Sequence, residues 1–283
     1  MNTMKDVSQQ MIRSIIAENM PAAAVVQALK NHDFGRKNIY LVAIGKAAWT
    51  MAKSATDYLG DQVENGVVIT KYDHSMGDLP KLAIFEAGHP TPDENTVLAT
   101  KKVIELVTNL TENDEVLFLV SGGGSALFEA PLDGITLDEL AMLNNQMLAS
   151  GADIVEINMI RKRLSQVKAG RFAQLCQPAS VFAVVLSDVL GDRLDTIASG
   201  PAAPDQSTSD DAIAVAKKYN LQLTEIQKLN LSVETPKKLN NVKTVITGSV
   251  RSLCESAAKS AATFGFTPYI LTTTLRLFAV LSG

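Results

Sequence analysis

Three glycines between two serines follow an apolar run, in the segment Ser121, Gly122, Gly123, Gly124 and Ser125. The five apolar residues before them are typical of a strand buried in a parallel sheet. Open α/β sheets bind their ligands at the carboxyl ends of the strands, where this loop would lie. Backbone without side chains lets N–H groups approach an anion, and the serine hydroxyls add donors. We therefore favour an oxyanion or phosphate cradle over a strand-to-helix turn that needs glycine only for its geometry.

Lys46 follows a second apolar run, residues 39–44, and would begin a helix. A lysine there brings its cation to a helix N-terminus, and both attract phosphate. A solvated lysine without a function is the alternative. The segment is not a Walker A loop, because one glycine precedes the lysine and Ala47 follows it.

Asp188 and Asp192 follow a third apolar run, residues 181–186. Their spacing would let two carboxylates face one divalent cation, and magnesium prefers one or two carboxylates together with substrate phosphates. A helix cap and a turn residue explain the two acids equally well, so both interpretations stay open.

Polar and basic residues recur at spacings of three and four later in the chain. They are Asn158, Arg161, Ser165 and Lys168, with further charge from Lys162, Arg163 and Arg171. The spacing predicts one side of a helix, and in an otherwise acidic chain it suggests a basic wall for an anionic substrate. A solvated basic helix is the alternative. His89 precedes two prolines, Pro90 and Pro92, and could act on a substrate, but we favour a structural role for it.

The composition limits the class of protein. The chain has 283 residues, 46% of them hydrophobic and only 5% aromatic, as layered α/β proteins tend to have. Its net charge of −4 argues against nucleic-acid binding. No apolar stretch is long enough to span a membrane, the first residues lack the pattern of a signal peptide, and the two cysteines have no metal spacing. These features favour a cytoplasmic protein and disfavour partners such as nucleic acids and membranes.

Apolar runs alternate with helical patterns along the chain, which predicts an α/β fold with a Rossmann-like, multi-layer and mostly parallel sheet. The expected strands are residues 39–44, 66–70, 82–85, 116–120, 181–186, 242–247 and 268–272. One or two helices are expected between residues 136 and 172. We expect one domain over residues 1–240, with residues 241–283 as the start of a second, C-terminal domain.

The ordered motifs of this chain resemble the glycerate 2-kinase family whose members carry a C-terminal MOFRL domain. They are residues 44–48, 87–94, 121–127, 157–168, 187–192 and 197–201. The resemblance implies transfer of the γ-phosphoryl group of ATP, with Mg²⁺, to the C2 hydroxyl of D-glycerate, giving 2-phosphoglycerate. It leaves open whether the protein forms a homodimer. Many members were also labelled hydroxypyruvate reductases.

The resemblance also implies roles for the residues singled out above. Lys46 would neutralise charge on the transferring phosphoryl group, and the glycine loop would bind phosphate or the glycerate carboxylate. Asn158, Arg161 and Lys168 would bind anionic oxygens of the substrate. Asp188 and Asp192 would organise magnesium or the reacting hydroxyl.

The end of the chain departs from the family pattern. Residues 275–281 form an apolar tail that stops where family members continue, so we interpret the chain as truncated and expect impaired activity. Two alternatives to the kinase remain. A hydroxypyruvate or tartronate reductase would need a dinucleotide fingerprint, which is absent, and a non-catalytic anion-binding fragment would explain the tail.

Overall fold

Six parallel strands form a single sheet in the computed structural model, which describes residues 3–187 and 193–273. The strands are β1 (Asn38–Ile44), β2 (Val63–Lys71), β3 (Leu82–Ala87), β4 (Asp114–Val120), β5 (Ser180–Leu186) and β6 (Val242–Thr247). They lie in the order β3-β2-β1-β4-β5-β6, and each neighbouring pair is parallel. This arrangement confirms the predicted Rossmann-like α/β fold.

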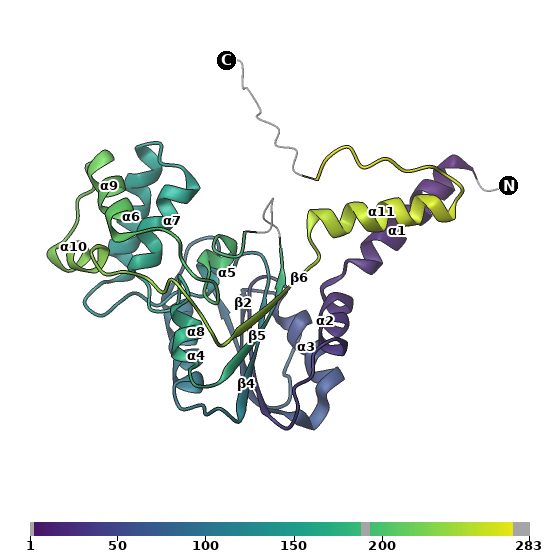
Figure 1. Cartoon of the computed structure of the whole chain (residues 1–283), viewed down its shortest axis with the longest axis horizontal. Helices are drawn as coiled ribbons and strands as arrows, with labels where there is room; N and C mark the ends of the chain where they lie inside the picture. The colour runs from purple at the N-terminus through teal and green to yellow at the C-terminus, as the bar shows by residue number, and fades with distance from the viewer. Residues whose placement is uncertain (1–2, 188–192, 274–283) are drawn as a thin grey trace, which may run out of the picture.

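Helices cover both faces of the sheet and also form two peripheral groups (Figure 1). They are α1 (Met4–Glu18), α2 (Pro21–Lys30), α3 (Ala48–Leu59), α4 (Glu94–Val107), α5 (Gly124–Leu127), α6 (Leu137–Ala149), α7 (Ile154–Arg163), α8 (Arg171–Leu175), α9 (Ser209–Lys218), α10 (Glu225–Leu231) and α11 (Val250–Thr263). Helices α2 and α3 cover one face, and α4 and α8 cover the other. Helices α6, α7, α9 and α10 form a lobe beside the sheet, whereas α1 lies along α11.

Side-chain caps explain where several helices begin. The capping residues are Asp93, Thr136, Asp153, Thr208 and Thr224, and each accepts a hydrogen bond from a backbone N–H of the first turn. Such caps satisfy donors that the helix itself leaves unpaired. Helix α10 has no counterpart among the predicted elements, although its cap, Thr224 followed by Gln227, is a recognisable start signal.

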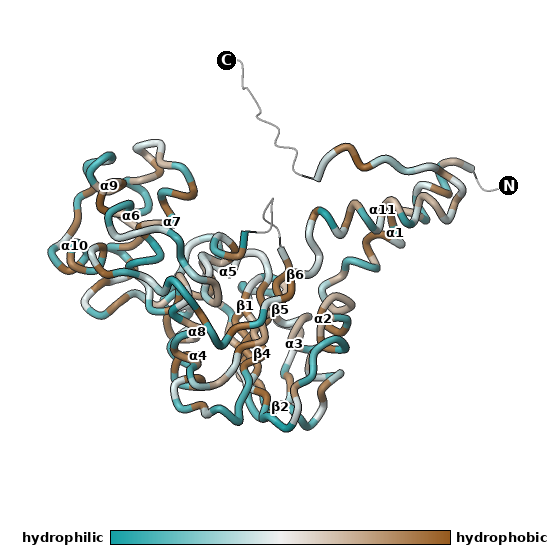
Figure 2. The backbone as a smooth tube through the Cα atoms, in the orientation of Figure 1, coloured by the Kyte–Doolittle hydropathy of each residue, from teal (hydrophilic) through white to brown (hydrophobic). Residues whose placement is uncertain are grey.

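The sheet is apolar on both faces because helices cover both. In β4, Leu117 and Leu119 pack into the core beneath α2 and α3, whereas Phe118 and Val120 pack into the core on the opposite face. Figure 2 shows the central strands as the most hydrophobic part of the chain. Burial on both faces accounts for continuous apolar runs in place of alternation with polar residues.

The structure differs from one of the predicted strands. Residues 268–272 form no strand: Tyr269 and Leu271 are exposed, and no neighbouring strand among the described residues pairs with this segment. Between residues 136 and 172 the helices α6 and α7 match the expected one or two helices, and the short helix α8 begins only at Arg171. Strand β6, predicted to open a second domain, pairs with β5 in the same sheet. The division into domains stays a prediction.

Three phenylalanines anchor the core on the α4 side of the sheet. The ring centroid of Phe172 lies 4.5 Å from that of Phe118 and 5.4 Å from that of Phe128. Phe172 is fully buried. Replacing Phe172 with Ala should therefore lower the free energy of unfolding by about 3–5 kcal/mol, as large cavities in packed cores do. Urea denaturation followed by circular dichroism measures this loss.

Phe264→Ala provides the matched control, because Phe264 is 38% exposed at the end of α11. We expect it to cost under about 1 kcal/mol, in the range of ordinary surface substitutions. Equal losses of unfolding free energy in the two variants would contradict the conclusion that Phe172 stabilises the core.

Candidate functional site

The loops that follow β1 and β4 meet at the carboxyl edge of the sheet. From β1 the chain crosses to β2 on one side, and from β4 to β5 on the other, so the order of strands reverses between them. Ligands of open α/β sheets bind at such a switch point. The backbone N–H of Lys46 donates to the carbonyl of Gly122 at 2.9 Å. The Ser121 hydroxyl accepts from the N–H of Ala47 at 3.0 Å and lies 3.2 Å from the Ile44 carbonyl. Ser121 therefore joins the two loops.

The glycine loop presents backbone donors without partners. Within residues 3–187 and 193–273, the N–H groups of Gly122, Gly123 and Ser125 have no hydrogen-bond acceptor. These three residues are partly exposed. Gly123 has φ +88°, a conformation that favours glycine, and a Cβ on it would lie 2.9 Å from the imidazole of His89. Backbone N–H groups without protein acceptors in one loop can bind an anionic oxygen.

Cations and an imidazole surround these donors. Lys46 is exposed, and its carbonyl lies 3.1 Å from Nδ1 of His74. Burial, with the charges of Lys46, Lys71 and His74, lowers the pKa of His89 below its usual value. His89 is therefore neutral near pH 7. The sequence favours a structural role for His89, whereas the structure places it against Gly123, beside Lys46.

A strained left-handed segment supports the loop from the β5 side. Ala198 and Ser199 have φ +51° and +63°, and Gly200 has φ +68°. Such angles cost about 1–2 kcal/mol for a residue with a side chain, so the surroundings must hold them. The Ser199 hydroxyl lies 2.7 Å from that of Ser125 and donates to Oδ1 of Asn158 at 3.3 Å. Asn158 is buried, and it contacts the loop through this chain of hydrogen bonds.

The predicted basic face on one helix is wrong. Helix α7 ends at Arg163, so Asn158 and Arg161 lie on it, whereas Ser165 and Lys168 lie beyond it. Leu164 caps the helix, and the chain then pairs Ser165 with Pro131 in an isolated antiparallel bridge. Helical spacing in the sequence could not show that the helix stops after ten residues.

Lys168 is buried beneath the glycine loop. Its ammonium group donates to the carbonyls of Ser125 (2.8 Å) and Phe128 (3.0 Å), and lies 3.3 Å from Oε2 of Glu129. Three partners match its three protons. Burial lowers the pKa of Lys168 to about 8, although the carboxylate of Glu129 opposes that effect. The group therefore holds the far end of the loop in place.

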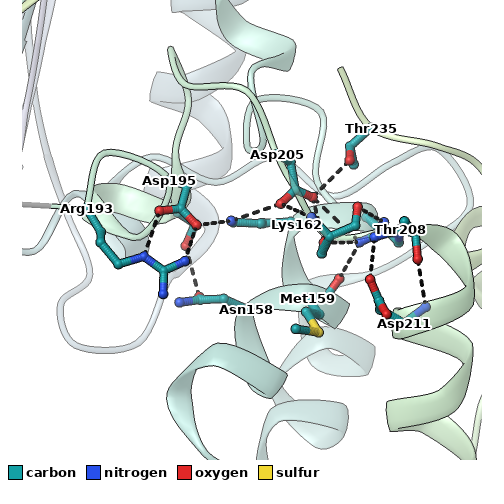
Figure 3. Close-up of polar contacts among 12 residues, drawn as sticks. Asn158, Met159, Lys162, Arg193, Asp195, Asp205, Thr208, Asp211 and Thr235 are labelled. Carbon is teal, nitrogen blue, oxygen red and sulfur yellow. Dashed lines mark hydrogen bonds and ion pairs between the residues drawn. The ribbon is translucent and has the colours of Figure 1, made fainter. Parts of the chain in front are cut away.

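Lys162 and Arg163 belong to a buried ion network (Figure 3). The Lys162 ammonium lies 3.2 Å from Asp205 and 3.6 Å from Asp195, and the guanidinium of Arg163 lies 3.6 Å from Asp205. Thr235 also donates to Asp205 at 2.8 Å. These contacts connect α7 to the segments that follow β5. The charges that looked like a wall for substrate are mostly paired inside the protein, and Arg161 remains partly exposed.

The predicted metal ligands, Asp188 and Asp192, lie outside the described residues. Among residues 3–187 and 193–273 no group of three or more His, Cys, Asp or Glu side chains is placed to hold a metal ion. The interpretation of these two acids stays a prediction.

Comparisons with known proteins agree on one family. The family described as "Domain of unknown function (DUF4147)" matches residues 7–231. The chain is 50% identical to the D-glycerate 2-kinase of Thermotoga maritima over 273 residues, which are 96% of this chain and 65% of that protein. It is 36% identical to the glycerate 2-kinase of Pyrococcus horikoshii in an alignment that covers 96% of this chain and 65% of that protein. A crystal structure of the Thermotoga maritima glycerate kinase has a TM-score of 0.91, covering 94% of this chain and 64% of that one.

Removing the acid at the centre of the ion network should destabilise the protein. Asp205→Asn keeps the shape but leaves Lys162 and Arg163 without their shared buried carboxylate. Breaking a buried pair from one side costs about 3 kcal/mol or more in the free energy of unfolding. Urea denaturation measures the loss. Asp57→Asn, which removes an exposed partner of Lys53, should cost less than about 1 kcal/mol; equal costs would contradict this account.

The charge of Lys46 should be detectable at His89. Burial contributes most to the lowered pKa of His89, and Lys46 is the next cause. In Lys46→Met the pKa of His89 should therefore rise towards, without reaching, its ordinary value. Titration of the three histidine Cε1–H signals by NMR measures the shift.

Lys53→Met is the control, since Lys53 lies on α3, the helix that follows Lys46, and its ammonium pairs with Asp57. It should leave the titration of His89 unchanged. An unchanged pKa of His89 in Lys46→Met would show that the two side chains do not interact.

Proposed function

Since the chain belongs to the DUF4147 family, that of the glycerate 2-kinases, we propose that it transfers the γ-phosphoryl group of ATP to the C2 hydroxyl of D-glycerate, giving 2-phosphoglycerate. One observation supports this most strongly. Lys46 and the unpaired N–H groups of the glycine loop lie together at the switch point of the sheet. The chain spans 65% of the length of both curated relatives, so the activity of the whole protein is part of the proposal.

The geometry supplies what phosphoryl transfer requires. The reaction depends on positioning and on stabilising charge at the phosphoryl oxygens, with little need for covalent chemistry. In this proposal the N–H groups of Gly122, Gly123 and Ser125 hold phosphate oxygens, and Lys46 neutralises the charge that is transferred. His89, neutral near pH 7, offers a hydrogen-bonding nitrogen beside them.

The other predicted site residues divide into two roles. Arg161, partly exposed, is proposed to bind an anionic group of the substrate. Lys168 and Asn158 are buried and act through other groups, because Lys168 holds the loop carbonyls and Asn158 holds Ser199. They are positioning residues in this account.

Magnesium remains a proposal that rests on two acids. When bound, Mg²⁺ neutralises the phosphates of the nucleotide. Asp188 and Asp192 are its proposed ligands, and they lie outside the described residues, so no step is derived through the ion.

Location and assembly are proposed on the sequence alone. No helix within residues 3–187 and 193–273 is both long and apolar enough to cross a membrane. A cytoplasmic location and a homodimeric assembly remain proposals.

A coupled assay of ADP release with D-glycerate, ATP and magnesium tests the function. Release should depend on D-glycerate and should fall about 10³-fold in Lys46→Met, by analogy with the loss of other cationic stabilisers of phosphoryl transfer. Lys53→Met is the control and should retain the activity of the parent chain.

Two outcomes would contradict the proposal. Equal activity of Lys46→Met and the parent chain would exclude Lys46 from the reaction. Binding of ATP and D-glycerate without ADP release would favour the alternative of a non-catalytic anion-binding fragment.

A further inference from the structure

A cavity of about 180 Å³ lies between α6, the loop at residues 90–92 and the segment that follows α5. Pro90, Leu137 and Leu140 contribute apolar walls. Its polar lining comes from two asparagines of α6 and from two charged residues. These are Asn144, Asn145, Glu129 and Arg161. The cavity thus combines opposite charges with uncharged amides, a lining that suits a small and very polar ligand.

Glu129 carries a buried oxygen without a donor. The residue is 2% exposed, and its Oε2 is held 3.3 Å from the ammonium of Lys168. Its Oε1 is buried and has no hydrogen-bond partner among the described residues. Buried carboxylate oxygens are almost always hydrogen-bonded, because an unpaired one loses its hydration without compensation. Because Glu129 lines the cavity, an O–H group of a ligand could supply the missing donor.

Arg161, by contrast, lacks an anionic partner among the described residues. Its guanidinium donates to the carbonyl of Ser125 at 3.3 Å, and no carboxylate within the described ranges lies within ion-pair distance. The charges of Arg161 and Lys168 repel each other, because the two side chains lie close together. Glu129 adds one negative charge to these two positive charges. The net charge of this group is therefore +1, which favours a ligand with a single negative charge.

We propose that this cavity is the subsite for the acceptor, a small hydroxy acid whose carboxylate binds Arg161 and whose hydroxyl donates to Oε1 of Glu129. The inference rests on the proposed function and adds Glu129 as a residue that determines specificity. The cavity is large enough for a small acid, since about 180 Å³ is many times the roughly 10–15 Å³ that a single water requires. Arg161 contacts the carbonyl of Ser125, so the subsite adjoins the glycine loop.

Calorimetric titration with two carboxylates tests the role of each charged residue. D-glycerate carries hydroxyls, whereas propionate carries none, so the ratio of their Kd values isolates the hydroxyl contact. Glu129→Gln should weaken D-glycerate binding about tenfold or more and leave propionate nearly unchanged. Arg161→Met should weaken both ligands alike.

A second pair of variants avoids any change to the Glu129–Lys168 ion pair. Ala141 lines the cavity on α6, and its neighbour Met142 is 62% exposed and does not. Ala141→Phe should fill the cavity and abolish D-glycerate binding with the thermal unfolding midpoint maintained. Met142→Phe places the same side chain on the same helix and should bind as the parent chain does.

The results separate this proposal from the proposed function. If Ala141→Phe still releases ADP in response to D-glycerate, the subsite is overturned, whereas the proposed kinase activity remains supported. D-glycerate binding that Ala141→Phe abolishes, without ADP release by the parent chain, would support the subsite and contradict the kinase. An unchanged ratio of Kd values in Glu129→Gln would mean that only water donates a hydrogen bond to Oε1, and it would overturn the subsite. An absence of D-glycerate binding to the parent chain would also overturn it.

Discussion

Strands β1 and β4 lie side by side at the point where the chain reverses the direction in which it builds the sheet, and the candidate site depends on this constraint. Their crossovers leave in opposite directions, so the two loops are free to meet at the carboxyl edge. Ser121 joins them by contacts to both Ala47 and Ile44. Two segments more than seventy residues apart in the sequence are thereby joined, and Lys46 lies beside Gly123 of the glycine loop.

Buried charged groups that need not contact a ligand hold the glycine loop in position. Lys168 binds two carbonyls of the turn that follows the glycines, and its own charge is balanced by Glu129. On the other side, the left-handed backbone at Ser199 is held by Ser125 and Asn158. Buried ions and strained backbone are both costly, so they persist only where the surroundings satisfy them. Here buried ions and strained backbone both lie directly around the loop, and they fix the position of its backbone N–H donors.

The proposed function assigns different ligands to the two sides of the glycine loop. On the exposed side, N–H groups that have no acceptor among the described residues lie beside Lys46, whereas the buried side rests on Lys168. Arg161 contacts the loop from the cavity that α6 lines. In this proposal a phosphoryl donor and a small acid approach one loop from two sides, in keeping with a reaction that requires alignment more than covalent participation by the protein.

Local pattern was enough to identify the strands β1 to β6, the helices between residues 136 and 172 and the position of the glycine loop, because burial on both faces demands apolar runs and helices show their own periodicity. The ordered motifs were enough to identify the family. Whether an individual charged side chain is buried, and which partner it has, could not be predicted in this way. Lys162 and Lys168 look like surface cations in the sequence, yet both are buried, and their partners Asp205 and Glu129 lie about forty residues away in the chain. Helical spacing also placed Lys168 on a helix that ends at Arg163. Periodicity reports which residues are buried along one element, whereas the environment of a charge is set by long-range contacts that only the tertiary structure provides.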